Sequence, residues 1–286
     1  MIRNNIRAEG RVIVKTWISL SIMLAVSCAC AILLSGRLGV MVEKLSQSPV
    51  EVLALLGIYN IEQKHISLMI FYMVAILLNI VAISKAAGAA VEAVKEDEEN
   101  GSIRFFMHQT YSCDQIWIGK MGVAIGSALM QWVLYVISMI LMVGLICYRY
   151  DLLFAVEVQN VVMIGIRGGL FVVLAVGICL LYSLKEDLEM TYEYFVSSVF
   201  WGCFLVGNLY KVFAMLSCYT ASARMEMQLR KLEGIFENLR ILFPFTVLNV
   251  FHEGKMPLPN FTYIIYALIT VVILLVYGYA YRRDRK

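Results

Sequence analysis

Charged residues and prolines are scarce in this sequence. Only 16% of its 286 residues are charged, whereas a soluble domain usually carries about 25%. Four prolines are spread along the chain, and 61% of the residues are hydrophobic. Uncharged runs near 20 residues are expected where lipid is the solvent. The composition therefore excludes an ordinary soluble protein and indicates a single membrane domain, residues 1–286, with no separate soluble domain.

Motifs for catalysis and metal binding are also missing. The chain has no GxxxxGK[ST], because Gly119-Lys120 is followed by Met121, and it has neither HExxH nor GxSxG. Its three histidines lie in different segments, and no CxxC pair occurs. We therefore expect no enzymatic activity, no metal and no cofactor in this chain. A net charge of +3, without a basic patch interleaved with aromatics, also argues against nucleic acid as a partner.

The seven cysteines lie mostly inside apolar runs, where a thiol behaves as a small hydrophobe. Cys147 and Cys218 both fall near the expected outer surface, so a disulfide between them stays open. The basic start, the apolar stretch and Ala29-Cys30-Ala31 have the order of a signal peptide. The apolar run continues through Leu34, however, so we expect this segment to be retained as a helix.

Six apolar runs predict six transmembrane helices, over approximately residues 16–36, 66–84, 121–148, 158–184, 192–219 and 256–281. The expected fold class is an all-α, polytopic membrane protein, because a helix satisfies its own backbone hydrogen bonds in lipid. The second helix should continue past Lys85 to about Val94, since Ala and Glu are good helix formers. That extension projects it out of the membrane.

Amphipathic segments accompany these spans. Residues 1–15 carry a basic residue at every fourth position: Arg3, Arg7, Arg11 and Lys15. This pattern is typical of an interfacial helix on an anionic leaflet, and ordinary positive flanking charge explains it as well. Within 220–255, apolar residues recur at spacings of three and four: Met225, Leu229, Leu232, Phe236, Leu239 and Phe243. We expect an external amphipathic helix that covers the bundle or lies on the outer leaflet, with a coiled-coil partner as the alternative.

Lysine and arginine set the expected orientation. With both termini cytoplasmic, the larger share of these residues lies on the inner side, as the positive-inside rule requires. The segment 85–120, between the second and third spans, is then a cytoplasmic loop. We expect a multi-pass protein of the cell membrane, in a bacterial plasma membrane.

Arg167 is the one charge well inside an expected span. An arginine at mid-bilayer costs about 2.5–3.5 kcal/mol on insertion scales, so its side chain should face protein, water or headgroups. It either lines a translocation path, binds an anionic lipid headgroup, or extends to the outer headgroups from a helix that begins deeper in the membrane. Gly165, Gly168 and Gly169 flank it and allow close helix contact or a break.

The 85–120 segment holds the densest charge in the chain, and its acidic run alone would suit a solvated face. Its string Glu98-Glu99-Asn100-Gly101-Ser102-Ile103-Arg104, followed by Ser112-Cys113-Asp114-Gln115-Ile116-Trp117-Ile118-Gly119-Lys120, resembles the intracellular loop of ABC-2 type transporter permeases. The resemblance extends over nearly the whole chain and includes the Phe243-Pro244-Phe245 entry to the last span. One departure is that Thr110-Tyr111-Ser112 stands where the family commonly has a proline.

The resemblance implies the transmembrane permease subunit of an ABC transporter, most often an exporter. Two copies, or one copy and a similar permease, would pair with separate cytoplasmic ATPase subunits that bind ATP and Mg, and membrane lipids would be further partners. The loop would carry the coupling contacts to the ATPase: Glu96, Asp97, Glu98, Glu99, Gly101, Arg104, Phe105 and Phe106. The substrate would be hydrophobic or amphipathic, such as an antimicrobial peptide, a drug or a lipid-linked molecule.

A second interpretation belongs to another class. A membrane sensor, immunity protein or scaffold without transport would use the same helices and bind a cytoplasmic partner through the same loop. Co-purification with an ATPase distinguishes the two. An ion channel is a third interpretation, but it would need a charged or carbonyl-lined filter sequence, and none is evident.

Overall fold

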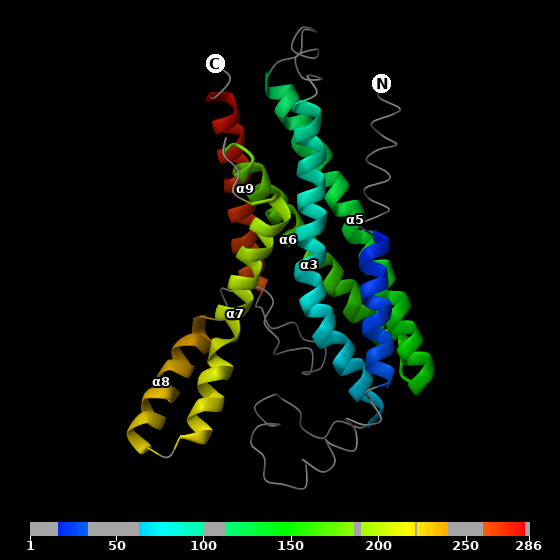
Figure 1. Cartoon of the computed structure of the whole chain (residues 1–286), viewed down its shortest axis with the longest axis vertical. Coiled ribbons are helices and arrows are strands. Elements are labelled where there is room, and N and C mark those ends of the chain that lie inside the picture. The colour runs from blue at the N-terminus through cyan, green and yellow to red at the C-terminus, as the bar shows by residue number, and fades with distance from the viewer. Residues whose placement is uncertain are drawn as a thin grey trace.

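The computed structural model describes residues 17–33, 63–99, 113–185, 190–220, 222–239 and 260–283, and helices dominate these residues (Figure 1). The labelled helices are α3 (Gln63–Glu99), α5 (Cys113–Tyr150), α6 (Phe154–Tyr182), α7 (Tyr192–Tyr219), α8 (Ala223–Leu239) and α9 (Asn260–Arg283). A further apolar helix covers Trp17–Leu33. The described residues contain no strand, so the predicted all-α fold is confirmed.

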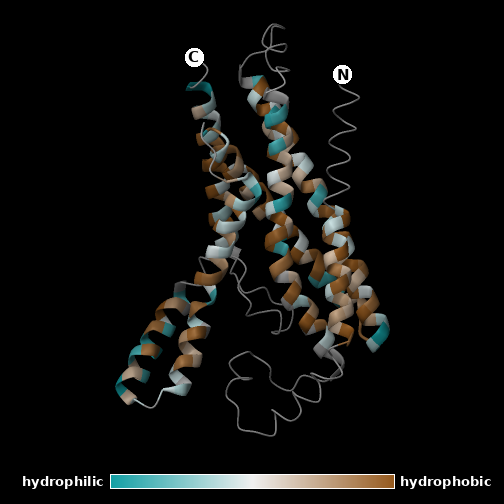
Figure 2. Ribbon diagram, in the orientation of Figure 1, coloured by the Kyte–Doolittle hydropathy of each residue, from teal (hydrophilic) through white to brown (hydrophobic). Residues whose placement is uncertain are grey.

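Five of these helices, α3, α5, α6, α7 and α9, are long and apolar enough to cross a membrane. Figure 2 shows hydrophobic residues along most of their length and more hydrophilic residues near several of their ends. The Trp17–Leu33 helix occupies the place of the first expected span but is shorter in its described part. A multi-pass membrane protein follows from these helices, and the count of six spans stays a prediction. The amphipathic segment 1–15 lies outside the described residues.

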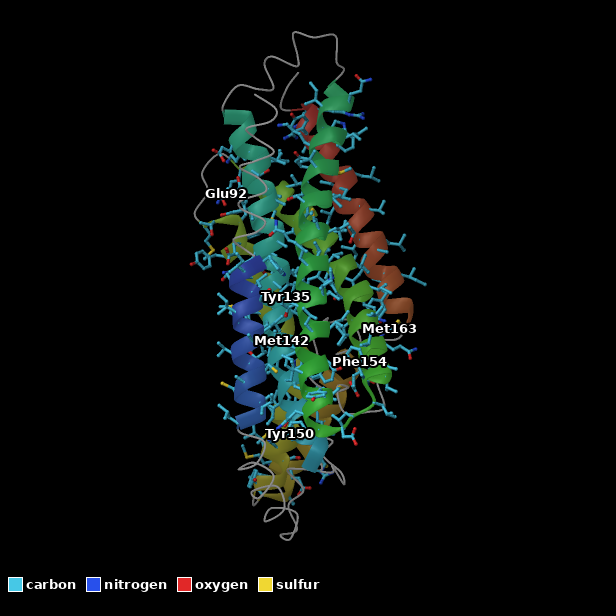
Figure 3. The ribbon with its side chains drawn as sticks, turned by 90° about the vertical axis from the view of Figure 1, so that its right-hand side faces the viewer. Glu92, Tyr135, Met142, Tyr150, Phe154 and Met163 are labelled. Carbon is cyan, nitrogen blue, oxygen red and sulfur yellow. The ribbon has the colours of Figure 1, made fainter. Side chains whose placement is uncertain are left out.

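Helices α3 and α5 run the length of the bundle, and their termini mark its two opposite ends (Figure 1). At one end, Lys95 of α3 lies over the ring of Tyr192 in α7, and Lys120 of α5 lies over Tyr281 of α9. At the other end, the Tyr72 hydroxyl of α3 donates to Glu157 of α6 at 2.7 Å. Glu92 and Tyr150, labelled in Figure 3, mark these two ends on α3 and α5. We call the end that holds Lys95 and Lys120 the acidic end, because α3 finishes there in Glu96-Asp97-Glu98-Glu99.

The segment 85–120, expected to be a cytoplasmic loop that is helical only as far as about Val94, is mostly helix. α3 continues without a break through the alanine-rich stretch to Glu99, and α5 begins at Cys113 rather than near Met121. Only residues 100–112 of this segment lie outside the described helices. Apolar length sets the part of a helix that lies in lipid, whereas good helix formers extend it into water.

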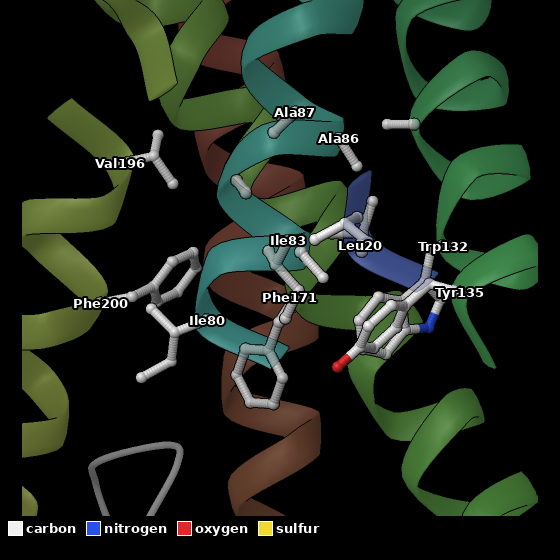
Figure 4. Packing of buried hydrophobic residues seen from close by; sticks show 14 of the residues in the cluster. Leu20, Ile80, Ile83, Ala86, Ala87, Trp132, Tyr135, Phe171, Val196 and Phe200 are labelled. Atoms are coloured by element: carbon white, nitrogen blue, oxygen red, sulfur yellow. The ribbon is translucent and has the colours of Figure 1, made fainter. Parts of the chain in front are cut away.

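The core lies where α3 meets α5, α6 and α7. Figure 4 shows Leu20 of the Trp17–Leu33 helix between α3 and α5, Phe200 of α7 beside Ile80 of α3, and Val196 of α7 further along the same side. These side chains are essentially removed from solvent. Polar links fix the Trp17–Leu33 helix on α5, since the Trp17 indole N–H lies 2.9 Å from the Ser138 hydroxyl. Because α3 packs against α5, α6 and α7, it is the central helix of the described bundle.

Helices α5 and α6 form a close antiparallel pair. The Trp132 indole N–H donates to the carbonyl oxygen of Gly165 at 2.8 Å, and its ring lies against Gly168. Asp151 ends α5 with a φ of 53°, a left-handed conformation that Asp tolerates better than most residues. The backbone N–H of Leu152 then donates to the carbonyl of Cys147 at 3.0 Å, the bond that closes a Schellman cap. The glycine cluster that was expected to allow close helix contact therefore lies in this pair.

α8 folds back against α7 to form a helical hairpin, which diverges from the other helices in Figure 1. The rings of Phe213 in α7 and Phe236 in α8 lie 5.2 Å apart. Glu226 and Arg230 form an exposed ion pair of 2.9 Å one turn apart on α8. The structure thus has a helix where the spacing predicts one, and the rest of 220–255 lies outside the described residues apart from Thr220 and Ser222.

Candidate functional site

The expected coupling residues lie at or beyond the end of α3. Glu96 is exposed in the last turns of this helix, and Asp97, Glu98 and Glu99 complete it. Gly101, Arg104, Phe105 and Phe106 lie outside the described residues. Glu92, one turn before Glu96, is also exposed and points away from the bundle in Figure 3. The acidic end of α3 is therefore open to a partner at Glu92 and Glu96.

A tight contact joins this part of α3 to the start of α7. A Cβ placed on Gly88 would lie 2.9 Å from the backbone nitrogen of Glu193 and 3.0 Å from its Cα. Only glycine permits the two backbones to approach this closely. Lys95 lies over the Tyr192 ring at 5.8 Å, which adds a cation–π contact near the same place. The backbone of α3 at Gly88 is thus in direct contact with the first turn of α7.

A second set of contacts at this end joins α5 to α9. The Trp117 ring packs on Gly278, where an added Cβ would meet Cη2 at 3.0 Å. The guanidinium carbon of Arg282 lies 5.9 Å from the Trp117 ring centroid, and the Lys120 Nζ lies 5.8 Å from that of Tyr281. Aromatic and basic residues of this kind are typical of a membrane–water interface. These contacts hold the beginning of α5 against the end of α9.

Arg167 lies near the middle of α6 and faces α9. Its guanidinium carbon is 5.1 Å from the ring centroid of Tyr263, which lies in the first turn of α9. On the next turn of α6, Phe171 packs edge-on against Tyr266 at 5.2 Å. Among the described residues no carboxylate lies within ion-pair distance of Arg167. The side chain therefore lies in a helix–helix contact rather than only extending along the bundle surface.

One further polar cluster lies at the opposite end of the bundle. The Glu157 carboxylate, in the first turn of α6, accepts from the Tyr72 hydroxyl at 2.7 Å and from the Asn160 amide at 3.3 Å. The fourth span was expected from about residue 158, but α6 begins earlier, at Phe154, and includes Glu157. Cys147 nearby is a buried free cysteine, so the disulfide with Cys218 left open by the sequence is not formed. This cluster ties α3 to α6.

The described residues contain no group of three or more His, Cys, Asp or Glu side chains placed to hold a metal ion. The fold and these contacts define the class of the chain, an all-helical, multi-pass membrane protein. No protein-family model matches the chain, and no curated protein or solved structure is significantly similar to it.

Sequence reasoning missed several residues that make these contacts. Gly88 and Gly278 were not predicted to lie at helix contacts, although small residues inside long apolar helices commonly mark close packing. Tyr263 and Thr262, at the start of α9, also gave no signal by themselves. Their importance follows only from the approach of α9 to α6, which depends on tertiary packing.

Proposed function

We propose that this chain is the membrane-spanning permease subunit of an ATP-driven ABC transporter of the ABC-2 type. It exports a hydrophobic or amphipathic substrate and works with separate cytoplasmic ATPase subunits and a second permease. The resemblance of the Glu98–Lys120 string to the family's intracellular loop supports this proposal. The membrane helices that flank that string support it further. ATP and Mg bind to the partner subunits, and this chain contributes no covalent chemistry.

The observation that carries the proposal is the continuity of α3. One helix runs from Gln63 to Glu99, from the centre of the bundle to the acidic end. A helix of 37 residues is about 56 Å long at 1.5 Å per residue, which exceeds the roughly 30 Å hydrocarbon core. Its surplus length extends into water at one or both membrane surfaces. A partner bound at Glu96 would therefore displace one continuous helix that is packed against α5, α6 and α7.

The mechanism follows from these contacts. Closure of the ATPase dimer displaces the segment around residues 96–112, which is cytoplasmic in this proposal. α3 passes the displacement to α7 at the Gly88–Glu193 contact, because the two backbones have no compressible side chain between them. The bundle then changes between accessible states by rigid-body movement of whole helices.

The test is co-purification followed by an ATPase assay. The affinity-tagged chain should retain a Walker-motif ATPase from its native host and should stimulate ATP hydrolysis. Glu96→Lys should weaken this complex by about tenfold, which corresponds to about 1.4 kcal/mol. The same substitution at Glu226 of α8, far from the acidic end, serves as the matched control and should change nothing.

Three results would contradict the proposal. One is an intact complex and an unchanged ATPase rate after deletion of residues 96–112. The other is a stable cytoplasmic partner that lacks a nucleotide-binding fold, which would favour the sensor or scaffold interpretation. Labelling of Glu98 to Ser112 from the exterior alone would also remove the source of the motion.

A further inference from the structure

Basic side chains gather at the acidic end where α5 begins and α9 ends. Arg282 and Arg283 are exposed in the last turn of α9, and Lys120 is half-buried near the start of α5. The Lys120 Nζ lies 5.8 Å from the ring centroid of Tyr281, the residue before Arg282. Two helices that are far apart in the sequence therefore build one positively charged surface. We call Lys120, Arg282 and Arg283 the basic cluster.

Buried aromatic rings lie beneath this cluster. Trp117 is 8% exposed and Tyr281 is 3% exposed, so both rings are fixed within the bundle. The guanidinium carbon of Arg282 lies 5.9 Å from the Trp117 ring centroid, and that ring packs on Gly278. A side chain that already lies over a fixed ring has less conformational freedom to lose when it binds a ligand. These rings therefore prepare the cluster for an anionic group.

On α9, exposed apolar residues continue from the basic cluster. Leu268, Leu275 and Arg282 recur every seven residues, so they lie on one face of the helix. The two leucines are 62% and 64% exposed. Leu275 lies about 10 Å from Arg282 along the helix axis, which is less than half of the roughly 30 Å hydrocarbon core. The charged end of this face is thus followed by an apolar surface that acyl chains can cover.

The adjacent face of α5 is apolar and open as well. Val123, three residues after Lys120, is exposed. A Cβ placed on Gly119 or on Gly122 would meet nothing within 4 Å, so there is open space beside this part of the helix. Apolar surface therefore begins at the basic cluster on both helices.

The acidic residues at this end of the bundle lie on a different helix. Glu92 and Glu96 belong to α3, whereas α9 packs mainly against α6 and α5. In Figure 3 the beginning of α5 and the end of α9 lie together near the top of the view, away from the labelled Glu92. The basic cluster and the acidic side chains of α3 thus form separate parts of the surface.

We propose that the basic cluster binds the headgroup of an anionic phospholipid, whose acyl chains lie along the exposed faces of α5 and α9. Lysine and arginine near an anionic membrane surface strengthen binding to it. A free anion would need the cluster alone, whereas the apolar face from Arg282 to Leu268 fits a molecule with a charged head and long apolar chains. The orientation expected from lysine and arginine places this end at the inner leaflet, which carries anionic lipids.

The test is a binding titration of the purified chain in detergent micelles without any ATPase, so its outcome is independent of the proposed coupling. Dansyl-labelled phosphatidylglycerol is titrated, and energy transfer from the tryptophans reports its binding. Unlabelled phosphatidylglycerol should displace it at a concentration at least about tenfold lower than phosphatidylcholine does. Glycerol phosphate, which has the charge without the acyl chains, should not displace it. Added NaCl should weaken the binding of phosphatidylglycerol, because salt screens exposed charges.

Matched variants locate the site. Arg282→Gln combined with Arg283→Gln should weaken binding of phosphatidylglycerol by at least about tenfold, and Lys120→Gln by about fivefold. Neither variant should change binding of phosphatidylcholine. Arg224→Gln combined with Lys231→Gln removes two exposed basic residues from α8 and should leave both affinities unchanged. If the double variant of α9 does not fold, Lys120→Gln decides alone.

Three results would overturn the proposal. One is equal affinity of the wild type for phosphatidylglycerol and phosphatidylcholine. Another is a loss of affinity in the α8 variant as large as that in the variants of the basic cluster. The third is displacement of the labelled lipid by glycerol phosphate as effectively as by phosphatidylglycerol, which would identify a site for a soluble anion.

Discussion

Replacement of Gly168 by alanine should separate α5 from α6. The added Cβ would lie 2.1 Å from Cζ2 of Trp132 and 2.9 Å from both Cε2 and Cη2. Ordinary carbon–carbon contacts are about 3.5–4.0 Å. The indole cannot easily move away, because its N–H donates to the Gly165 carbonyl at 2.8 Å and its ring packs on Tyr135. Either that hydrogen bond breaks or the two helices move apart.

The magnitude follows from three terms. Overpacking of a core typically costs about 1–3 kcal/mol, and loss of the indole hydrogen bond costs a further 0.5–1.5 kcal/mol, roughly. Alanine returns about 1 kcal/mol through its higher helix propensity. Gly168→Ala should therefore lower the free energy of unfolding by about 1–3 kcal/mol. Gly169→Ala, one residue away, meets only Leu129 Cδ2 at 3.8 Å and should raise it by up to about 1 kcal/mol.

The assay is unfolding of the purified protein in mixed micelles with increasing SDS, read out by the loss of helical circular dichroism. Because Gly168 and Gly169 share a helix and a depth, their difference isolates the contact with Trp132. A double-mutant cycle with Trp132→Leu should reduce the Gly168→Ala penalty, as residues in contact couple by about 0.5–3 kcal/mol. Equal midpoints for the two alanine variants would refute the packing of Trp132 on Gly168.

Two more predictions concern the ends of the bundle. Gly88→Ala should lower the free energy of unfolding by about 1–3 kcal/mol, because the new methyl group meets the Glu193 backbone. Gly126→Ala is the control, because a Cβ at Gly126 has nothing within 4 Å, and it should not lower the free energy of unfolding. The denaturation midpoints of the two variants measure the difference. Tyr72→Phe should lower the free energy of unfolding by about 1.5–3 kcal/mol, because it removes the donor to the Glu157 carboxylate. An unchanged midpoint in the same unfolding assay would argue against that hydrogen bond.

The presence of helices could be predicted well from this sequence, because few structures other than a helix satisfy their backbone hydrogen bonds in lipid. α7 covers Tyr192–Tyr219, the range expected from the apolar run. Its start is fixed locally, since Thr191 is its N-cap and the Thr191 side chain accepts from the Tyr194 N–H. A polar turn before an apolar run is a signal that a single sequence carries. The glycine cluster around Arg167 likewise indicated close contact.

The extension of α3 past Lys85 was predicted from its good helix formers, whereas the start of α5 and the rotation of the helices could not be predicted from hydropathy. Hydropathy marks where lipid ends, and α5 begins at Cys113, before the apolar run expected from Met121. The contact between Arg167 and Tyr263 could not be predicted for another reason. Which face of α9 meets α6 depends on how side chains from both helices interlock, so Tyr263 gains its role only from tertiary packing. The residues 100–106 of the candidate coupling segment stay a prediction.

The α7–α8 hairpin has a geometric consequence. α7 contains 28 residues and is therefore about 42 Å long, with its tight contact to α3 at the first turn. A swing of only 10° about that pivot would carry the distant tip of α7, together with α8, through roughly 7 Å. A small displacement near Gly88 would therefore move the far end of the α7–α8 hairpin through a much larger distance.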